Sequence, residues 1–295
     1  MKKVVGIFAI LFAVAFLPAV HAEQTNSVVI IDTAIDTNAK DLVGRVIHEV
    51  CIMETPRCPN GTNFMEGSGS ASLPIDQVYK GGFDHGTVMA SIAANTNKKV
   101  NIVFIRIVPM SVNKTTGVYT DNAVVQALNW VAKNKDKFNI VATSASIGHH
   151  NFKTLTNYCP IKLSLRESII QLKNIGVATM FAAGNNGLKG QGADLSRVDY
   201  PACIPEAISV GATNLNNGIE SYSNGGSDLD FYALGRHSVF SKTVLGTSGS
   251  SAALASYWAK VYKGDYNSTY DHLKSVSKTA SNARVQTTLF VDILG

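Results

Sequence analysis

Beyond its N-terminal region the sequence lacks any long apolar run, which limits the class of protein it can encode. No later stretch reaches the ~18 consecutive apolar residues of a membrane-spanning helix, so the mature chain should be soluble. The single early run, Val4 to Leu17, follows Lys2 and Lys3 and precedes the small residues of Val20-His21-Ala22. This pattern predicts a secretory signal peptide over residues 1–22, cleavage after Ala22, and a secreted or periplasmic protein.

A strong charge of one sign is also missing. The formal net charge is +5, and losing Lys2 and Lys3 with the signal peptide lowers it to +3. This charge is too small to argue for nucleic acid or membrane surfaces as partners. No repeat or shift in composition divides the rest of the chain, so we expect one domain over 23–295, acting as a monomer.

Cysteines are few but even in number. In an oxidising compartment the four cysteines predict disulfides, for which three pairings exist. Cys51 and Cys58 are close together in the sequence, which favours a local bond and would leave Cys159 with Cys203. Zinc is the alternative, although no Cys-x-x-Cys pair is present. We expect no metal or cofactor; calcium stays open, because no convincing set of ligands can be named.

Short apolar β-branched segments alternate with segments of helical period. Strands are predicted at 27–31, 101–108, 139–145, 177–182 and 207–211. Helices are predicted at 85–94, from a cap at Asp121, around Leu165 to Leu172, and from near Ser248 onward to close the core. This alternation predicts an α/β fold of three layers, αβα, with a mostly parallel central sheet. The segment 51–82, rich in Gly, Ser, Pro and Asn, is predicted to be a surface loop.

Two polar residues follow apolar strands directly. Asp32 ends the first strand, and Asn185 comes shortly after the strand at 177–182. Sites in parallel sheets form at the carboxyl ends of the strands, so both residues are candidates for one site.

Gly246-Thr247-Ser248-Gly249-Ser250 opens an amphipathic run. Ser248 is therefore expected in the first turn of a helix, near unpaired N–H groups and the positive end of the helix dipole. That environment suits a nucleophile whose product carries an oxyanion. The alternative is a serine that only caps the helix.

Four segments resemble the subtilisin-like serine proteases, or subtilases. Asp32 lies in Val29-Ile30-Ile31-Asp32-Thr33, His85 in Asp84-His85-Gly86-Thr87, Asn185 in Ala182-Ala183-Gly184-Asn185, and Ser248 in Gly246-Thr247-Ser248. The order Asp, His, Ser is that of subtilisin. The resemblance spans Val28 to Val261.

The resemblance implies a serine endopeptidase that acts on polypeptides through an acyl-enzyme. Ser248 would be the nucleophile, His85 its base and later the acid, and Asp32 the group that orients the imidazole. The Asn185 amide and the Ser248 N–H would bind the oxyanion.

The resemblance also implies where substrate binds. The segment that would pair with an extended peptide, and the walls of the pocket for the residue before the cut, comprise Ser144, Ser146, Ile147, Gly148, Ala183 and Gly184. Asp199 would lie near the floor of this pocket and favour Lys or Arg.

The sequence departs from the family pattern at Ala34, Leu234, Gly249 and Ala252, none of which removes a group that the mechanism needs. Nine residues separate Ala22 from Asp32, too few for the folding pro-segment of secreted relatives. We expect that the chain folds unaided or with a partner. The placement of Cys203 resembles a disulfide-bearing subset of the family, which supports Cys159–Cys203.

Three other functions remain as alternatives. The first is a catalytically impaired subtilase fold that serves as a binding module. The second is an esterase of the α/β-hydrolase type. Against it, Ser250 stands where the nucleophile elbow of such an enzyme needs glycine, and only the adjacent Asp271-His272 could follow Ser248 as its acid and histidine partners. The third, a dinucleotide loop at Gly184 to Gly190, lacks G-x-G-x-x-G.

Overall fold

The central element of the fold is a ten-stranded sheet. The computed structural model describes residues 25–79, 83–110, 117–148, 159–189, 197–282 and 285–291. The strand order is β11-β12-β8-β7-β6-β5-β1-β4-β2-β3. The strands are β1 Ser27–Asp32, β2 Val46–Ile52, β3 Phe64–Glu66, β4 Asn101–Arg106, β5 Ile140–Ala145, β6 Ala178–Ala182, β7 Ile208–Thr213, β8 Phe231–Leu234, β11 Lys278–Asn282 and β12 Val285–Phe290.

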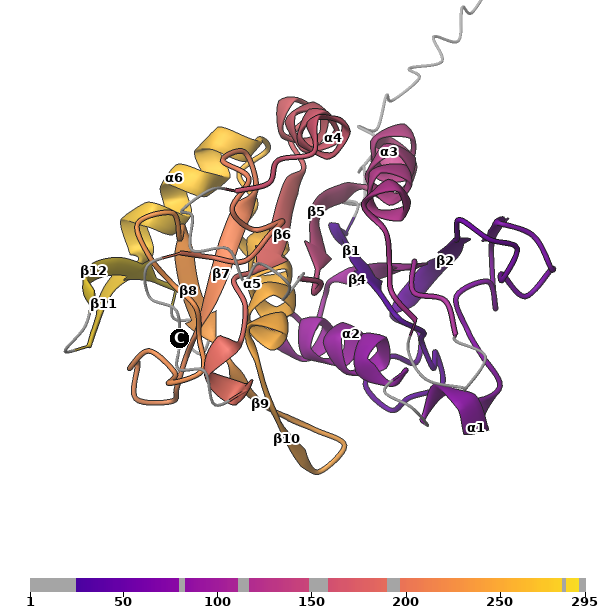
Figure 1. Cartoon of the computed structure of the whole chain (residues 1–295), viewed down its shortest axis with the longest axis horizontal. Helices are drawn as coiled ribbons and strands as arrows, with labels where there is room; N and C mark the ends of the chain where they lie inside the picture. The colour runs from indigo at the N-terminus through magenta and orange to yellow at the C-terminus, as the bar shows by residue number, and fades with distance from the viewer. Residues whose placement is uncertain are drawn as a thin grey trace, which may run out of the picture.

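Neighbouring strands run parallel from β12 to β2, and only the outermost pairs, β11–β12 and β2–β3, are antiparallel. Helices α3 (Asp121–Phe138) and α4 (Leu163–Asn174) pack on one face, and α2 (His85–Thr96), α5 (Thr247–Val261) and α6 (Tyr266–Val276) pack on the other (Figure 1). The prediction of a three-layer αβα fold with a mostly parallel sheet is confirmed.

Strand β1 shows why the apolar segments are continuous rather than alternating. Val28 and Ile30 face the core beneath α2 and α5, whereas Val29 and Ile31 face the core beneath α3 and α4. All four side chains are buried. A strand covered by helices on both faces needs apolar residues at every position.

The segment predicted to be a surface loop is partly structured. It contains the end of β2, all of β3 and the short helix α1 (Ile75–Val78), so the loop prediction is wrong for these parts. The physical reason is Glu49, a buried carboxylate in β2 that accepts hydrogen bonds from the N–H groups of Gly69 and Ala71. These bonds draw a polar, glycine-rich segment onto the sheet, an effect that local composition does not reveal.

Two smaller expectations are also wrong. Thr120, not Asp121, caps α3, because the Thr120 hydroxyl accepts from the Ala123 N–H at 3.1 Å. Helix α5 does not close the core, because α6, β11 and β12 follow it. Before α5 the chain also forms a hairpin of β9 (Arg236–Val239) and β10 (Lys242–Leu245), which projects from the molecule in Figure 1.

Both expected disulfides are present. Cys51 bonds to Cys58 and Cys159 bonds to Cys203, with Cα–Cα distances of 5.8 and 5.7 Å. All four sulfurs are therefore occupied, and the zinc alternative is wrong. The signal peptide expected at residues 1–22 lies outside the described residues and stays a prediction.

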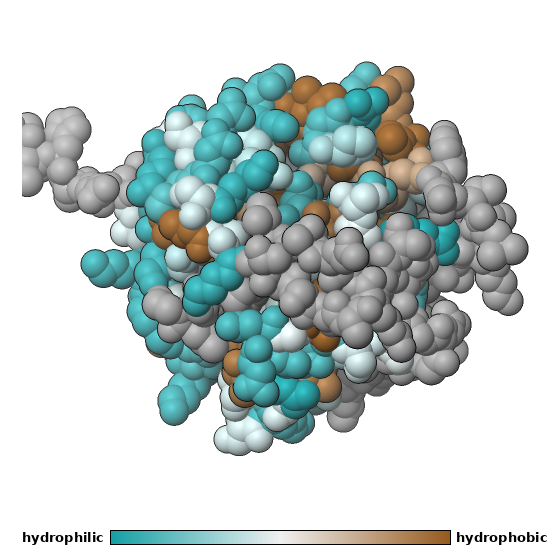
Figure 2. Space-filling model, turned by 90° about the vertical axis from the view of Figure 1, so that its left-hand side faces the viewer, coloured by the Kyte–Doolittle hydropathy of each residue, from teal (hydrophilic) through white to brown (hydrophobic). Residues whose placement is uncertain are grey.

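One side of the molecule has a mostly polar surface among the residues that the structure describes. Hydrophilic residues predominate on the side shown in Figure 2, and the hydrophobic ones gather in a few separate patches. Within the described ranges, no helix combines the length and the apolar character needed to cross a membrane.

Candidate active site

The predicted site residues gather where three neighbouring strands end. Asp32 is the last residue of β1, Ser146 follows β5, and Asn185 follows β6. These strands are adjacent in the order β1-β5-β6. Helices α2 and α5 begin at the same edge. The first turn of α2 bonds to Thr33, which follows β1, and the first turn of α5 bonds to Ser146, which follows β5.

Asp32 and His85 form a hydrogen-bonded pair. His85 Nδ1 lies 2.8 Å from Asp32 Oδ1, and since a carboxylate only accepts, Nδ1 carries the proton. Asp32 is 2% exposed, whereas the His85 side chain is 38% exposed and keeps Nε2 for another partner. Burial opposes the charged imidazole, but the charge and hydrogen bond of Asp32 prevail, so the pKa of His85 lies above its ordinary value. The pair is equipped to act as a general base.

Two threonine hydroxyls join the strand that ends in Asp32 to the helix that begins with His85. Thr33 Oγ1 donates to the Phe83 carbonyl at 2.8 Å and accepts from the Gly86 N–H at 2.9 Å. Thr87 Oγ1 accepts from the Asp36 N–H at 3.0 Å. These bonds fix the first turn of α2 against the residues that follow β1, and so fix His85 beside Asp32.

Ser248 is the second residue of α5. Gly246 is the N-cap residue, with φ +150°, and Ser248 is half-buried in the first turn, as the sequence predicts. Since Ser248 is not the capping residue, the interpretation as a capping serine is wrong. The Ser146 hydroxyl donates to the Ser248 carbonyl oxygen at 3.1 Å, which anchors this turn to the end of β5.

In the segment expected to bind peptide, several side chains face the interior of the protein. The Ser144 hydroxyl is buried and shares a hydrogen bond of 2.9 Å with Ser251 in α5. Ile147 is buried in the core beneath α3 and α4, and Gly148 is half-buried. With the Ser144 and Ser146 hydroxyls both bonded to α5, any peptide pairing by this segment falls to its main chain.

Asn185 is oriented by Thr247, the residue before Ser248. Asn185 Oδ1 accepts from the Thr247 N–H at 2.8 Å and from the Thr247 hydroxyl at 3.0 Å. The same hydroxyl accepts from the Gly184 N–H at 3.2 Å. With its oxygen held in this way, the Asn185 amide keeps its nitrogen, a double donor, for another acceptor.

The helices that carry these groups pack together. The Ser256 hydroxyl in α5 donates to the Ala93 carbonyl in α2 at 2.6 Å, and both helices share one core. A buried carboxylate, an imidazole, a hydroxyl in a helix first turn and an oriented carboxamide thus occupy one sheet edge. These are the groups that acyl transfer requires.

Asp199 lies against Gly184. A side chain at Gly184, where φ is +112°, would overlap Asp199 Oδ2. Asn224 orients the carboxylate, donating from Nδ2 to Asp199 Oδ1 at 3.1 Å, and its own N–H bonds to the Gly184 carbonyl at 3.0 Å. The main-chain groups of Ala183 bond to Val210 and Asp199. The Asp199 carboxylate therefore lies against Gly184, the residue that precedes Asn185 in the sequence.

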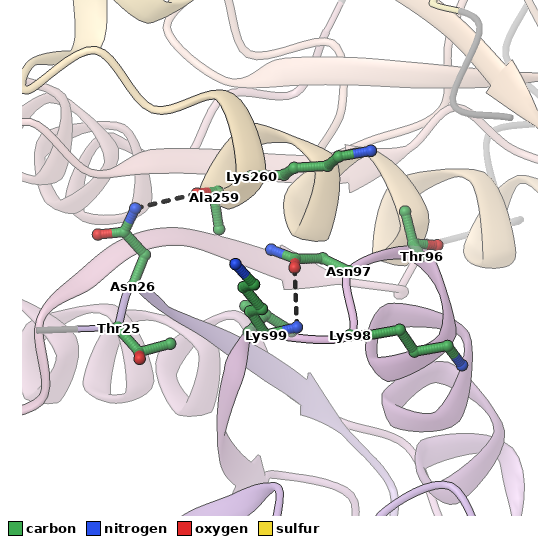
Figure 3. A pocket seen from close by; sticks show the side chains of 9 residues that line it. Thr25, Asn26, Thr96, Asn97, Lys98, Lys99, Ala259 and Lys260 are labelled. Atoms are coloured by element: carbon green, nitrogen blue, oxygen red, sulfur yellow. Dashed lines mark hydrogen bonds between the residues drawn. The ribbon is translucent and has the colours of Figure 1, made fainter. Parts of the chain in front are cut away.

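A hollow of about 710 Å³ lies elsewhere, where β1 and β4 begin and α2 and α5 end. In Figure 3 its lining includes Lys98, Lys99 and Lys260, and Asn26 Nδ2 donates to the Ala259 carbonyl. It shares no residue with the candidate site. In the part of the chain that the structure describes, no three His, Cys, Asp or Glu side chains form a group that could hold a metal ion.

Sequence reasoning missed the residues that orient the site. Thr33, Thr87, Thr247 and Asn224 have structural partners that depend on the fold. A signal for the threonines exists, because one lies within two residues of each of Asp32, His85 and Ser248.

Comparisons with known proteins identify the family of this chain. A family model described as the subtilase family matches residues 23–292. Subtilisin E of Bacillus subtilis (strain 168) is 27% identical over 227 residues, which cover 74% of this chain and 50% of the relative. A cuticle-degrading serine protease of Arthrobotrys oligospora is 30% identical over 205 residues, covering 64% and 45%. The chain thus spans about half the length of these curated relatives.

A solved structure has the same fold. The crystal structure of a cold adapted subtilisin-like serine proteinase matches with a TM-score of 0.65 and 23% identity, covering 92% of this chain and 90% of that one.

Proposed function

The chain belongs to the subtilase family, and from this premise we propose that it is a secreted serine endopeptidase acting through an acyl-enzyme. The observation that carries the proposal is the hydrogen bond of 2.8 Å between His85 Nδ1 and Asp32 Oδ1 at the edge where α5 begins. Family membership excludes the α/β-hydrolase and dinucleotide alternatives. The pattern of residues 1–22 supports export.

In the proposed reaction Ser248 Oγ attacks the carbonyl carbon of the substrate peptide bond. His85 Nε2 takes the hydroxyl proton, and the resulting imidazolium is stabilised by Asp32. Collapse of the tetrahedral intermediate breaks the C–N bond, and His85 gives its proton to the leaving amine. Water then attacks the ester by the same route and regenerates Ser248.

The oxyanion of each intermediate would accept from the Asn185 amide nitrogen and the Ser248 N–H. The orientation of Asn185 by Thr247 supports this role, because a donor fixed in advance needs no reorganisation as charge develops. The Ser248 N–H belongs to the first turn of α5, where main-chain N–H groups lack partners within the helix.

The substrate would be a polypeptide lying along residues 146–148, with the residue before the cut near Gly184. The contact between Gly184 and Asp199 supports a preference for Lys or Arg at that residue. Asn224 orients the Asp199 carboxylate, and a carboxylate is the group with which a cationic side chain of the substrate would pair.

The remaining alternative is a subtilase fold that binds without cleaving. The test is casein hydrolysis by purified mature protein, with and without a serine-directed fluorophosphonate, alongside Ser248→Ala. We expect Ser248→Ala to lower kcat by roughly 10⁶-fold while the protein stays folded. Ser268→Ala, an exposed serine in the first turn of α6, is the matched control and should keep full activity. A folded wild-type protein that neither cleaves casein nor reacts at Ser248 would favour the binding module.

A further inference from the structure

His237 occupies the space beside the residue that follows Ser248. A Cβ built on Gly249 would lie 2.8 Å from His237 Cδ2, closer than real Cβ contacts, and 3.3 Å from Nε2, a tight contact. The same Cβ would lie 3.3 Å from Ile92 Cδ1 in α2. The imidazole therefore takes up the volume that a side chain at position 249 would need.

The ring of His237 is fixed by the main chain. Nε2 lies 2.8 Å from the Leu234 carbonyl oxygen, and since that oxygen only accepts, Nε2 carries the proton. Burial lowers the pKa of His237, which keeps the ring neutral. Because its Nε2 proton is committed to Leu234, we assign His237 no proton transfer.

Two departures from the family pattern meet at this ring. Leu234 supplies the carbonyl that holds His237, and Gly249 supplies the space that the ring fills. The adjoining residue Gly235 also contacts α5, because its carbonyl accepts from the Gly246 N–H at 3.1 Å. The end of β8, the start of β9 and the first turn of α5 thus form one packed unit.

We propose that His237 is a positioning residue for Ser248. It acts through Gly249, holding the first turn of α5 against Ile92 of the helix that begins with His85. The proposal rests on the proposed function, because it takes Ser248 as the nucleophile. Misplacement of a reacting group by about 1 Å can lower a rate by roughly 10²-fold, so packing behind the nucleophile is enough to change turnover.

The test is a double-mutant cycle of His237→Ala and Gly249→Met. Each single variant should lower kcat and the rate of acylation by a fluorophosphonate by about 10-fold or more, with KM within about 2-fold. In the double variant the methionine side chain refills the vacated space, and both rates should return to within about 3-fold of wild type. If a variant of the cycle fails to fold, a milder substitution takes its place. Gly249→Ala inserts a smaller side chain at position 249, and His237→Phe keeps a ring at position 237 but lacks the N–H donor.

His48→Ala is the matched control. His48 is another half-buried histidine, but it stacks on Trp130 and Phe138 at the far side of the sheet from α5. Its removal should lower the melting temperature and leave kcat unchanged, which separates loss of packing from loss of positioning.

Three results overturn the proposal, and they are distinguishable. Acylation of the folded single variants at the wild-type rate would show that His237 does not position Ser248. Single effects that add in the double variant would show that residues 237 and 249 are independent. A wild-type protein that is not labelled at Ser248 would overturn the proposed function, and this inference with it.

Discussion

Thr247 holds Asn185 by two hydrogen bonds, from its N–H at 2.8 Å and from its hydroxyl at 3.0 Å, both to Asn185 Oδ1. The residue before the proposed nucleophile thus orients the proposed oxyanion donor. These bonds join the residue after Gly184, at the end of β6, to the first turn of α5, two segments 62 residues apart in the sequence, and so couple the position of Asn185 to that of Ser248.

Thr247→Val should lower kcat by about 10-fold with little change in KM. The substitution removes the hydroxyl but keeps the main-chain N–H, so Asn185 loses one of two restraints. Asn185→Ala removes the donor itself and should cost on the order of 10²–10³-fold in kcat. Steady-state kinetics on a peptide substrate measure both, with Thr243→Val, in the exposed part of β10, as control. Equal kcat for Thr247→Val and wild type would show that the hydroxyl has no part in orientation.

Thr33→Val should lower both stability and turnover. It leaves the Phe83 carbonyl and the Gly86 N–H without their hydroxyl partner, at a cost of about 1–3 kcal/mol for each buried group. The loosened link between β1 and α2 should also lower kcat by misaligning His85. Thermal unfolding and kcat, measured on the same preparation, test this. If the melting temperature falls while kcat stays constant, Thr33 contributes to stability alone.

The four motifs could be recognised from the sequence because strand ends, helix starts and functional residues coincide in them. The apolar strand at 27–31 ends at Asp32, and the small residues at 246–249 begin a helix, so local pattern and site coincide. Local pattern also predicts the central strands β1, β4, β5, β6 and β7 and the helices α2 to α5 within a few residues, but not α6 or the outer strands β2, β3, β8, β11 and β12.

The remaining features depend on partners distant in the sequence. Strand β2 was not predicted because His48 and Glu49 interrupt its apolar pattern, and each has a partner that justifies its burial only in the fold. His237 gave no signal, since nothing local indicates that its ring fills the space beside Gly249.

The acid limb of activity should have a midpoint above the ordinary histidine pKa of about 6.5. Asp32 raises the pKa of His85 in the folded protein, and the base must be neutral to accept a proton. Asp32→Asn removes the raising charge, so the limb should move to lower pH while kcat falls by roughly 10⁴-fold. The pH dependence of kcat/KM measures the shift.

The same pair has a consequence for stability. Because the folded pKa of His85 is raised, its contribution is complete below about pH 6.5 and is lost as the pH rises through the folded value. The difference in melting temperature between wild type and Asp32→Asn should therefore be larger at low pH than at high pH. A difference that is independent of pH would contradict the pairing.

The two disulfides should contribute unequally. Cys159–Cys203 closes a loop with a sequence separation of 44, whereas Cys51–Cys58 closes one of 7. Loop-closure entropy predicts about 4 kcal/mol for the first and about 2 kcal/mol for the second. Denaturant unfolding of the two paired Cys→Ala variants tests the order. A larger loss for the short loop would indicate that native-state contacts, rather than chain entropy, set the contribution.

Asp199→Asn should change substrate preference rather than turnover. A charge-assisted hydrogen bond contributes about 1.5–3 kcal/mol, so kcat/KM for substrates with Lys or Arg before the cut should fall by roughly 10- to 100-fold. Substrates with Phe or Leu there should be unaffected, because the shape of the pocket is retained. A peptide library differing only at this residue measures both, with Asp228→Asn, an exposed carboxylate, as control. If the wild-type enzyme shows no preference for basic residues, Asp199 does not line the pocket. Cleavage of the library peptides by that enzyme would still support the Ser248 mechanism.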